Sequence, residues 1–128
     1  MAHQHEDILR KIDEAMLKGD LAAFFSYYTE DVEGHVRGKN KLAGDYKGKD
    51  QLQALFGRFM DAIGTYSFEN HAYFADDEHG VVLQRSRSER GGKALELDEV
   101  FVMHFREGKV SEMWYVPVDQ AALDAWIG

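Results

Sequence analysis

The sequence predicts an α+β fold in which helices cover one face of an antiparallel sheet. In the first half of the chain, apolar residues recur at the three- and four-residue spacing of amphipathic helices. From Tyr66 onward the spacing changes to two, which is the period of a strand. The pair Gly91-Gly92 lies between two strand-like runs, and both positions tolerate the positive φ of a tight hairpin turn.

The first two expected helices are separated by a turn. Apolar residues of the first recur at positions 8, 9, 12, 15 and 16, which lie on one helical face. Gly19 can end this helix, and Asp20 can cap the next one. The second helix is expected to bury Phe24, Phe25 and Tyr28 on its apolar face.

Residues 34–48 end a short strand and form a glycine-rich loop ahead of a third helix. His35 lies on the strand, directly before this loop. Asp50 and Gln53 have the spacing of a capping box, so we expect the third helix to begin there and to end at Gly64. A strand, a loop and a helix in this order predict the mouth of a small-molecule pocket.

Four strands joined by turns are expected after the third helix. They cover residues 66–74, 81–89, 94–106 and 109–117. The Gly91-Gly92 turn sets the register of the second and third of these strands, because it pairs residue 90 with residue 93. Asp119 can then cap a short final helix.

The third of these strands indicates that both faces of the sheet are covered. Between Val100 and Phe105 it is apolar on both faces, apart from His104. A sheet with one face in water would alternate more regularly between apolar and polar residues. We therefore expect a homodimer that buries the second face of the sheet.

Composition excludes several classes of protein and site. With 128 residues, 45% of them apolar, the chain is expected to form one domain over residues 1–128. A net charge of −8 argues against a nucleic-acid partner. No stretch has the length of a membrane span or the pattern of a signal sequence, so we expect a cytoplasmic protein that does not contact membranes. The absence of cysteine excludes disulfides, thiolate metal sites and thiol nucleophiles.

Three motifs occur in order along nearly the whole chain. They are Gly19-Asp20-Leu21, then His35 with Leu42-Ala43-Gly44 and Tyr46-Lys47-Gly48, and finally Phe105-Arg106-Glu107-Gly108-Lys109-Val110 with Glu112, Trp114 and Asp119-Gln120. In this order and spacing the sequence resembles the SnoaL-like branch of the NTF2-like superfamily. The resemblance implies a cone-shaped fold, often dimeric, in which a strongly curved antiparallel sheet wraps around helices and leaves a deep cavity at the open end. The superfamily hosts diverse functions, so this fold alone does not define the chemistry.

The resemblance extends to ketosteroid isomerase, a member of the same superfamily, but the residues of that enzyme's reaction are missing. Its first-helix tyrosine would fall at Ile12 and its catalytic base at Gly34. Its oxyanion-stabilising aspartic acid would fall at Phe101, give or take one residue. The sequence therefore excludes steroid isomerisation by that mechanism. Scytalone dehydratase, another member, uses a histidine pair and tyrosines; His35 and His71 with Tyr28 could correspond to these, although without a residue-by-residue match.

Three residues are candidates for acid–base catalysis. His35 is the first, because imidazole titrates near neutral pH and the residue precedes the expected pocket loop. Glu99 interrupts an apolar strand, and a bulge that turned it into the cavity would make it a candidate acid or base. Tyr115 is expected to assist. The alternative for His35 is a surface histidine bonded to a loop carbonyl, and for Glu99 an edge carboxylate.

The hairpin register brings two arginines opposite two carboxylates. Arg85 faces Asp98, and Arg87 faces Glu96. Limonene epoxide hydrolase, another member of the superfamily, uses an Asp-Arg-Asp group, so one interpretation is epoxide hydrolysis with Arg85 and Asp98. The other is an exposed ladder of ion pairs, which is common and contributes little to stability.

A larger set of side chains is expected to bind the ligand, because methionines and aromatic rings suit an irregular apolar wall. This set comprises Tyr28, Phe59, His71, Tyr73, Phe101, Met103 and Met113. Strand alternation places His71 and Tyr73 on one face, which is an inner polar row or a solvated face. The histidines are scattered, without a pair at i, i+4, so no metal site is expected. No cofactor is expected either.

The residues and the resemblance together predict a protein that binds a small hydrophobic molecule in the cone-shaped cavity that the resemblance implies. The first hypothesis adds cofactor-free acid–base catalysis through His35, such as cyclisation, isomerisation or dehydration. The second is a binding or sensing module that uses the same cavity without catalysis. A third, an interaction protein that works through its sheet, is less favoured because a pocket-type loop accompanies the sheet.

Overall fold

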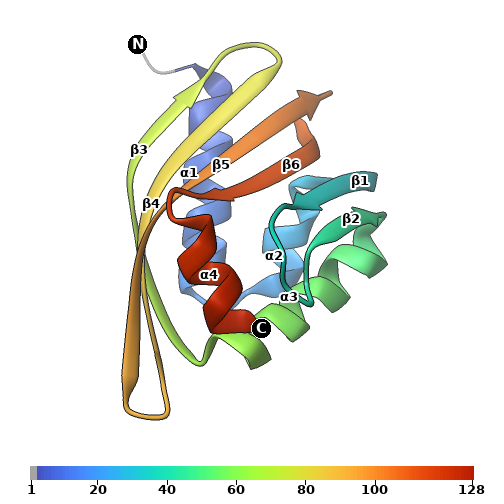
Figure 1. Cartoon of the computed structure of the whole chain (residues 1–128). Helices are drawn as coiled ribbons and strands as arrows, with labels where there is room; N and C mark the ends of the chain where they lie inside the picture. Colours follow the sequence, from blue (N-terminus) through green and yellow to red (C-terminus); the bar gives the residue numbers. More distant parts are fainter. Residues whose placement is uncertain (1–2) are drawn as a thin grey trace.

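Residues 3–128 of the computed structural model form an α+β domain with a single sheet (Figure 1). The helices are α1 (Gln4–Leu17), α2 (Leu21–Ser26), α3 (Lys49–Ile63) and α4 (Gln120–Ile127). The strands are β1 (Tyr28–Val36), β2 (Gly44–Lys47), β3 (Thr65–Ala75), β4 (His79–Arg90), β5 (Lys93–Arg106) and β6 (Lys109–Pro117). Within these residues, no helix combines the length and the apolar character needed to cross a bilayer.

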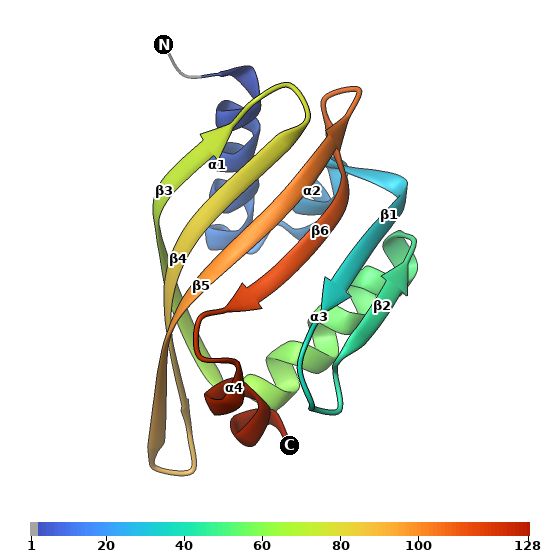
Figure 2. The ribbon, with the colours of Figure 1, turned by 45° about the horizontal axis from the view of Figure 1, so that its top comes forward.

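The sheet is strongly curved, and its six strands follow the order β2-β1-β6-β5-β4-β3. Figure 2 looks onto its outer face, with α1, α2 and α3 behind the strands. The helices therefore lie within the curve of the sheet, and the predicted α+β cone is confirmed. The sequence did not predict that β1 pairs in parallel with β6, whereas all other neighbouring strands are antiparallel.

The helix caps follow the sequence in two cases and depart from it in one. The side chains of Asp20 and Asp119 accept hydrogen bonds from backbone N–H groups in the first turns of α2 and α4, as predicted. The capping box expected at Asp50 is wrong, because α3 begins earlier, after Gly48, and has no side-chain cap. Gly48 has a φ of +85° that favours glycine. Tyr28, which was expected to extend the second helix, instead begins β1.

The hairpin register at Gly91-Gly92 is confirmed. The two glycines have φ values of +59° and +76°, and the flanking residues Arg90 and Lys93 are paired. The β4–β5 ladder then runs without a register shift as far as His79 and His104. The bulge considered at Glu99 is therefore absent from this ladder, and strand alternation alone turns Glu99 toward the helices.

A bulge does occur in β3, at a position the sequence did not predict. The β3–β4 register shifts between Asn70 and Ala72, so that His71 has no partner in the ladder. The shift reverses the alternation: Asn70 points inward before it and Tyr73 points inward after it, while His71 is exposed. The prediction that His71 and Tyr73 form an inner polar row is therefore wrong.

One further segment differs from expectation, and one histidine makes a contact that the sequence did not predict. Residues 44–47, expected as loop, form the edge strand β2, which pairs with the end of β1. His5 is buried and stacks on Phe105 with 4.1 Å between ring centroids. Its Nδ1 hydrogen-bonds the Asp76 backbone oxygen at 2.9 Å. The imidazole thus ties the first turn of α1 to the turn between β3 and β4.

Candidate functional site

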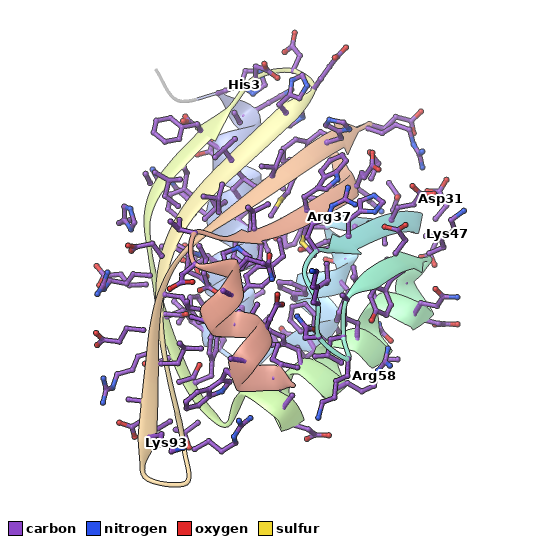
Figure 3. All side chains as sticks on the ribbon, viewed as in Figure 1. His3, Asp31, Arg37, Lys47, Arg58 and Lys93 are labelled. Carbon is purple, nitrogen blue, oxygen red and sulfur yellow. The ribbon has the colours of Figure 1, made fainter. Side chains whose placement is uncertain are left out.

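A cavity of about 490 Å³ lies between the inner face of the sheet and helices α1 and α3. This volume is in the range of small-molecule sites. Its wall is mainly apolar, and it is lined by Leu9, Ile12, Asp13, Met16, Leu17, Phe24, Tyr28, Val36, Leu42, Leu55, Phe56, Phe59, Met60, Tyr66, Ser67, Phe68, Asn70, Val82, Gln84, Phe101, Met103, Met113 and Tyr115. No lysine, arginine or histidine is among these described lining residues. Figure 3 shows charged side chains such as Lys47 and Lys93 at the periphery instead.

The mouth of the cavity is not where the sequence placed it. The exposed lining residues are Leu17 at the end of α1, Met60 on α3 and Ser67 on β3. Of residues 34–48, only Val36 and Leu42 line the cavity, and they form part of its inner wall. The prediction that the glycine-rich loop forms the mouth is therefore wrong, because the loop leads into the edge strand β2.

Most residues of the predicted ligand-binding set do meet at the cavity. Tyr28, Phe59, Phe101, Met103 and Met113 all line it, and so does Tyr115. His71 is absent from the wall because the bulge in β3 turns it to solvent. Tyr73 is also absent from the wall, because its side chain packs against α1.

Glu99 is the centre of a buried polar cluster at the wall, formed with Tyr66, Gln84 and Tyr115 and called the Glu99 cluster below. The Gln84 Nε2 donates to Glu99 Oε1 at 2.9 Å and to the Tyr66 hydroxyl oxygen at 2.8 Å. The Tyr115 hydroxyl donates to Glu99 Oε2. Glu99 is only 2% exposed and does not itself line the cavity, whereas its three partners do. A ligand would therefore meet the amide and phenol groups, with the carboxylate behind them.

The two phenols of the Glu99 cluster are held in their protonated form. Burial raises the pKa of Tyr115, and the charge and hydrogen bond of Glu99 raise it further. Burial, followed by the charge of Glu99, also raises the pKa of Tyr66. Both side chains therefore stay neutral near pH 7 and act as hydrogen-bonding groups.

His35 lies outside the cavity, on the outer face of the sheet, so its expected position at the pocket is wrong. It is paired with Trp114 of β6, and the two rings stack with 5.0 Å between centroids. Its Nδ1 lies 2.5 Å from Asp45 Oδ1 and its Nε2 lies 2.7 Å from Glu112 Oε2. Burial lowers the pKa of His35, but the hydrogen bonds and charges of Asp45 and Glu112 outweigh it and the net shift is upward. The ring thus bridges two carboxylates, and both of them favour its protonated form.

The same pairing assembles a group of metal-ligand types that sequence spacing did not reveal. Glu33, His35 and Glu112 offer ligand atoms that lie within 4.8 Å of one another. They come together because Glu33 and Glu112 are partners in the parallel β1–β6 ladder, 79 positions apart in the sequence. Both nitrogens of His35 already have carboxylate partners, so the ion pairs account for this arrangement.

The arginine ladder of the hairpin forms as the register predicted. Arg85 Nη1 lies 3.0 Å from Asp98 Oδ1, and Arg87 Nη1 lies 3.1 Å from Glu96 Oε1. These side chains are about half exposed and do not line the cavity. Their position favours the exposed ladder over the epoxide hydrolase interpretation, because all four side chains are about half exposed to water.

Sequence reasoning missed five polar residues of the described cavity wall: Tyr66, Ser67 and Gln84, and also Asp13 on α1 and Asn70 on β3. The Tyr73 hydroxyl donates to Asp13 Oδ2 at 2.6 Å. Burial, together with the hydrogen bond and charge of Asp13, raises the pKa of Tyr73 to about 12. Asp13 could have been found from its spacing, since it follows Leu9 by four residues on the apolar face of α1.

Comparison with known proteins agrees with this geometry. The family model of the SnoaL-like domain matches residues 9–113. An uncharacterised protein of Mycobacterium tuberculosis is 29% identical over 122 residues, which cover 94% of this chain and 93% of that protein.

Two solved structures have the same fold over nearly their whole length. The protein Bal32a, from a soil-derived mobile gene cassette, is 27% identical with a TM-score of 0.90, and the match covers 99% of this chain and 98% of that one. An NTF2-like protein of unknown function from Burkholderia pseudomallei is 21% identical with a TM-score of 0.87, and the match covers 98% of each chain. The family match establishes that the chain belongs to the SnoaL-like family, and these likenesses show that it shares the fold of an NTF2-like protein.

Proposed function

We propose that the protein binds a small, mostly apolar molecule that carries an oxygen atom, inside the cavity. The observation that carries this proposal is a cavity of about 490 Å³ with an apolar wall and one convergent set of hydrogen-bonding groups, the Glu99 cluster. Such a combination is typical of ligand sites, because the apolar wall supplies affinity and the few polar groups fix orientation.

The mouth supports the same proposal. Leu17 is 66% exposed and Met60 is 45% exposed, although both are large apolar side chains. They line the entrance, where an apolar ligand passes from water into the cavity. Bound there, the ligand would cover apolar surface that water otherwise contacts.

Methionine methyl groups provide a direct test. Four of the five methionines, Met16, Met60, Met103 and Met113, line the cavity. In a protein labelled with ¹³C at the methionine methyls, the methyl ether of naphthylmethanol should shift the signals of these four residues. The indole N–H of Trp114, on the outer face, is an internal control that should not shift.

The outcome separates binding in the cavity from binding elsewhere. Saturable shifts of the four cavity methyls, with the Trp114 signal unchanged, would support the proposal. If the ether left all four methyls unchanged up to its solubility limit, or shifted Trp114 instead, the proposed function would be wrong.

A second function, acid–base catalysis in the same cavity, is favoured by the bond between Tyr115 and Glu99. Tyr115 Oη can accept a proton from a bound substrate while its own hydrogen passes to Glu99 Oε2. The substrate then becomes an anion, the phenol is restored, and the carboxylate ends protonated. Tyr115 is the catalytic residue in this proposal, and Glu99 acts through it. His35 has no part in it, because it lies on the outer face.

Proton exchange at a ketone tests catalysis without knowledge of the natural substrate. The protein should accelerate deuterium exchange of the acidic C–H groups of a tetralone, followed by NMR, and Tyr115→Phe should abolish the acceleration. Tyr28→Phe is the matched control, because Tyr28 also lines the cavity but has no carboxylate partner. If the tetralone bound but exchanged at the rate of buffer, the site would be a binding site without this catalysis.

We also propose that a second copy of the chain covers the outer face of the sheet. Val100, Val102 and Trp114 on this face are only partly buried, and Val116 is 39% exposed. A homodimer would remove this apolar strip from water. Sedimentation velocity at micromolar concentration should give twice the mass of one chain, and Val102→Glu should give monomers. A wild-type protein that sediments only as a monomer would contradict the proposal.

A further inference from the structure

Two buried oxygen atoms at the cavity have no hydrogen-bond partner. Among the described residues, three buried side-chain polar atoms are unpartnered: Asp13 Oδ1, Asn70 Oδ1 and Thr29 Oγ1. The first two belong to residues that line the cavity, and the third does not. Buried polar groups are nearly always paired in folded proteins, so two unpaired acceptors in one cavity wall require a partner from outside the chain.

The position of the Asp13 carboxylate is fixed by its other oxygen. Asp13 Oδ2 accepts from the Tyr73 hydroxyl at 2.6 Å, and the Arg10 guanidinium lies over the Tyr73 ring at 4.4 Å. This contact holds the carboxylate while Oδ1 stays without a donor. Because one oxygen is anchored, Oδ1 is a preorganised acceptor for a ligand group.

Asn70 connects this acceptor to the rest of the site. It is paired with Gln84 across β3 and β4, and Gln84 is paired with Glu99 across β4 and β5. The cavity wall therefore carries a continuous polar row from Asn70 to the Glu99 cluster, and Tyr73 of the same strand as Asn70 holds Asp13 of α1. The chain supplies both Glu99 oxygens with donors from Gln84 and Tyr115 but supplies none to Asp13 Oδ1 and Asn70 Oδ1.

We propose that Asp13 and Asn70 form an acceptor subsite for a hydrogen-bond donor, a hydroxyl or a protonated amine, on an otherwise apolar ligand. The inference rests on the proposed function, since it names the chemistry of the ligand held in the cavity. The absence of a cationic side chain among the described lining residues supports it, because nothing in the wall competes with the ligand for Asp13. The ligand is thus an amphiphile whose donor end lies against α1.

A matched series of probes tests the subsite. Naphthylmethanol offers a hydroxyl, naphthylmethylamine offers a protonated amine, and the methyl ether of naphthylmethanol keeps the apolar body without a donor. We expect at least one of the two donors to bind about tenfold more tightly than the ether, because a hydrogen bond to a charged group strengthens binding by about that factor. Comparing the two donors tells whether charge or the hydroxyl is recognised. Calorimetry measures the affinities, and the methionine methyl shifts locate the probes.

Substitution of the carboxylate tests the role of the residue. In Asp13→Asn the Tyr73 hydroxyl can still donate to the side-chain oxygen, which turns an N–H group toward the cavity. The preference for donors should disappear, while the ether should bind as tightly as before or more tightly. Asp7→Asn is the matched control, because Asp7 lies on the same helix but is exposed and outside the cavity. It should leave all three affinities unchanged.

The outcomes distinguish failure of the subsite from failure of the cavity. If all three probes bind the wild type equally, the acceptor subsite is wrong and cavity binding stands. If the donor preference persists in folded Asp13→Asn, the donor is held elsewhere and the inference is overturned. If no probe binds, both proposals fail. The wild-type comparison needs no variant, so the inference stays falsifiable even where a variant does not fold.

Discussion

Replacing Tyr115 with phenylalanine removes one hydroxyl and leaves the rest of the buried ring in place. In the folded protein that hydroxyl donates to Oε2 of Glu99, whose side chain is 2% exposed. A hydrogen bond to a charged group contributes about 1.5–3 kcal/mol, and a buried acceptor that loses its donor keeps the cost of its lost hydration. We therefore expect Tyr115→Phe to lower the free energy of unfolding by about 2–3 kcal/mol.

The same substitution at Tyr28 is the matched control. Tyr28 is also buried and also lines the cavity, but the one hydrogen bond of its hydroxyl is a weak contact with Met113 Sδ at 4.0 Å. Tyr28→Phe should therefore cost less than about 1 kcal/mol. Size, ring type and environment are alike in the pair, so the difference isolates the carboxylate.

Urea denaturation followed by tryptophan fluorescence measures both variants. A difference of about 2 kcal/mol between them should also separate their melting temperatures by roughly 6–10 °C in a domain of this size. In a Glu99→Gln background the cost of Tyr115→Phe should fall, because the charge that the hydroxyl stabilises is gone. If Tyr115→Phe cost no more than Tyr28→Phe, the assignment of the Glu99 cluster as a closed hydrogen-bond network would be refuted.

Three further predictions concern two glycines and two ion pairs outside the cavity. Gly64→Ala should destabilise the protein by about 3 kcal/mol or more, because Gly64 has a φ of +92° and an added Cβ would meet a backbone carbonyl of β4. Gly57→Ala, in α3 with no atom within 4 Å of the added Cβ, should stabilise it by about 0.5–1 kcal/mol; equal effects in urea melts would contradict this reasoning. Glu112→Gln should lower the pKa of His35 measured by NMR, because it removes one of the two carboxylates that raise it. Since that pKa is raised, the stability that His35 contributes is complete below about pH 6.5 and is lost as the pH rises through the pKa of His35 in the folded protein. An unchanged His35 titration in Glu112→Gln would exclude the ion pair between His35 and Glu112. Arg85→Ala should change the free energy of unfolding by less than about 1 kcal/mol, because the side chain is 56% exposed; a cost above 2 kcal/mol would show that the ladder is not a solvated one.

The errors about the site share one physical cause, which is the face on which a strand residue lies. His35 looked like a cavity residue because it stands before a glycine-rich loop, yet its side chain points outward. His71 looked inward by simple alternation, but one unpaired residue in β3 reverses that alternation. Neither the register of β1 against β6 nor the bulge in β3 has a local sequence signal, so neither could be predicted from the sequence.

The sequence by itself determined the α+β class, the Gly91-Gly92 hairpin and its register, and six of the aromatic and methionine residues that line the cavity. These follow from short-range causes: apolar periodicity, capping side chains and the φ values that glycine allows. Only the tertiary structure decided where the mouth lies and which polar groups meet there. It buried Glu99 behind Tyr115 and Gln84 and left the buried Asp13 Oδ1 without a hydrogen-bond partner. These contacts join segments far apart in the chain, and their approach depends on the curvature and pairing of the whole sheet.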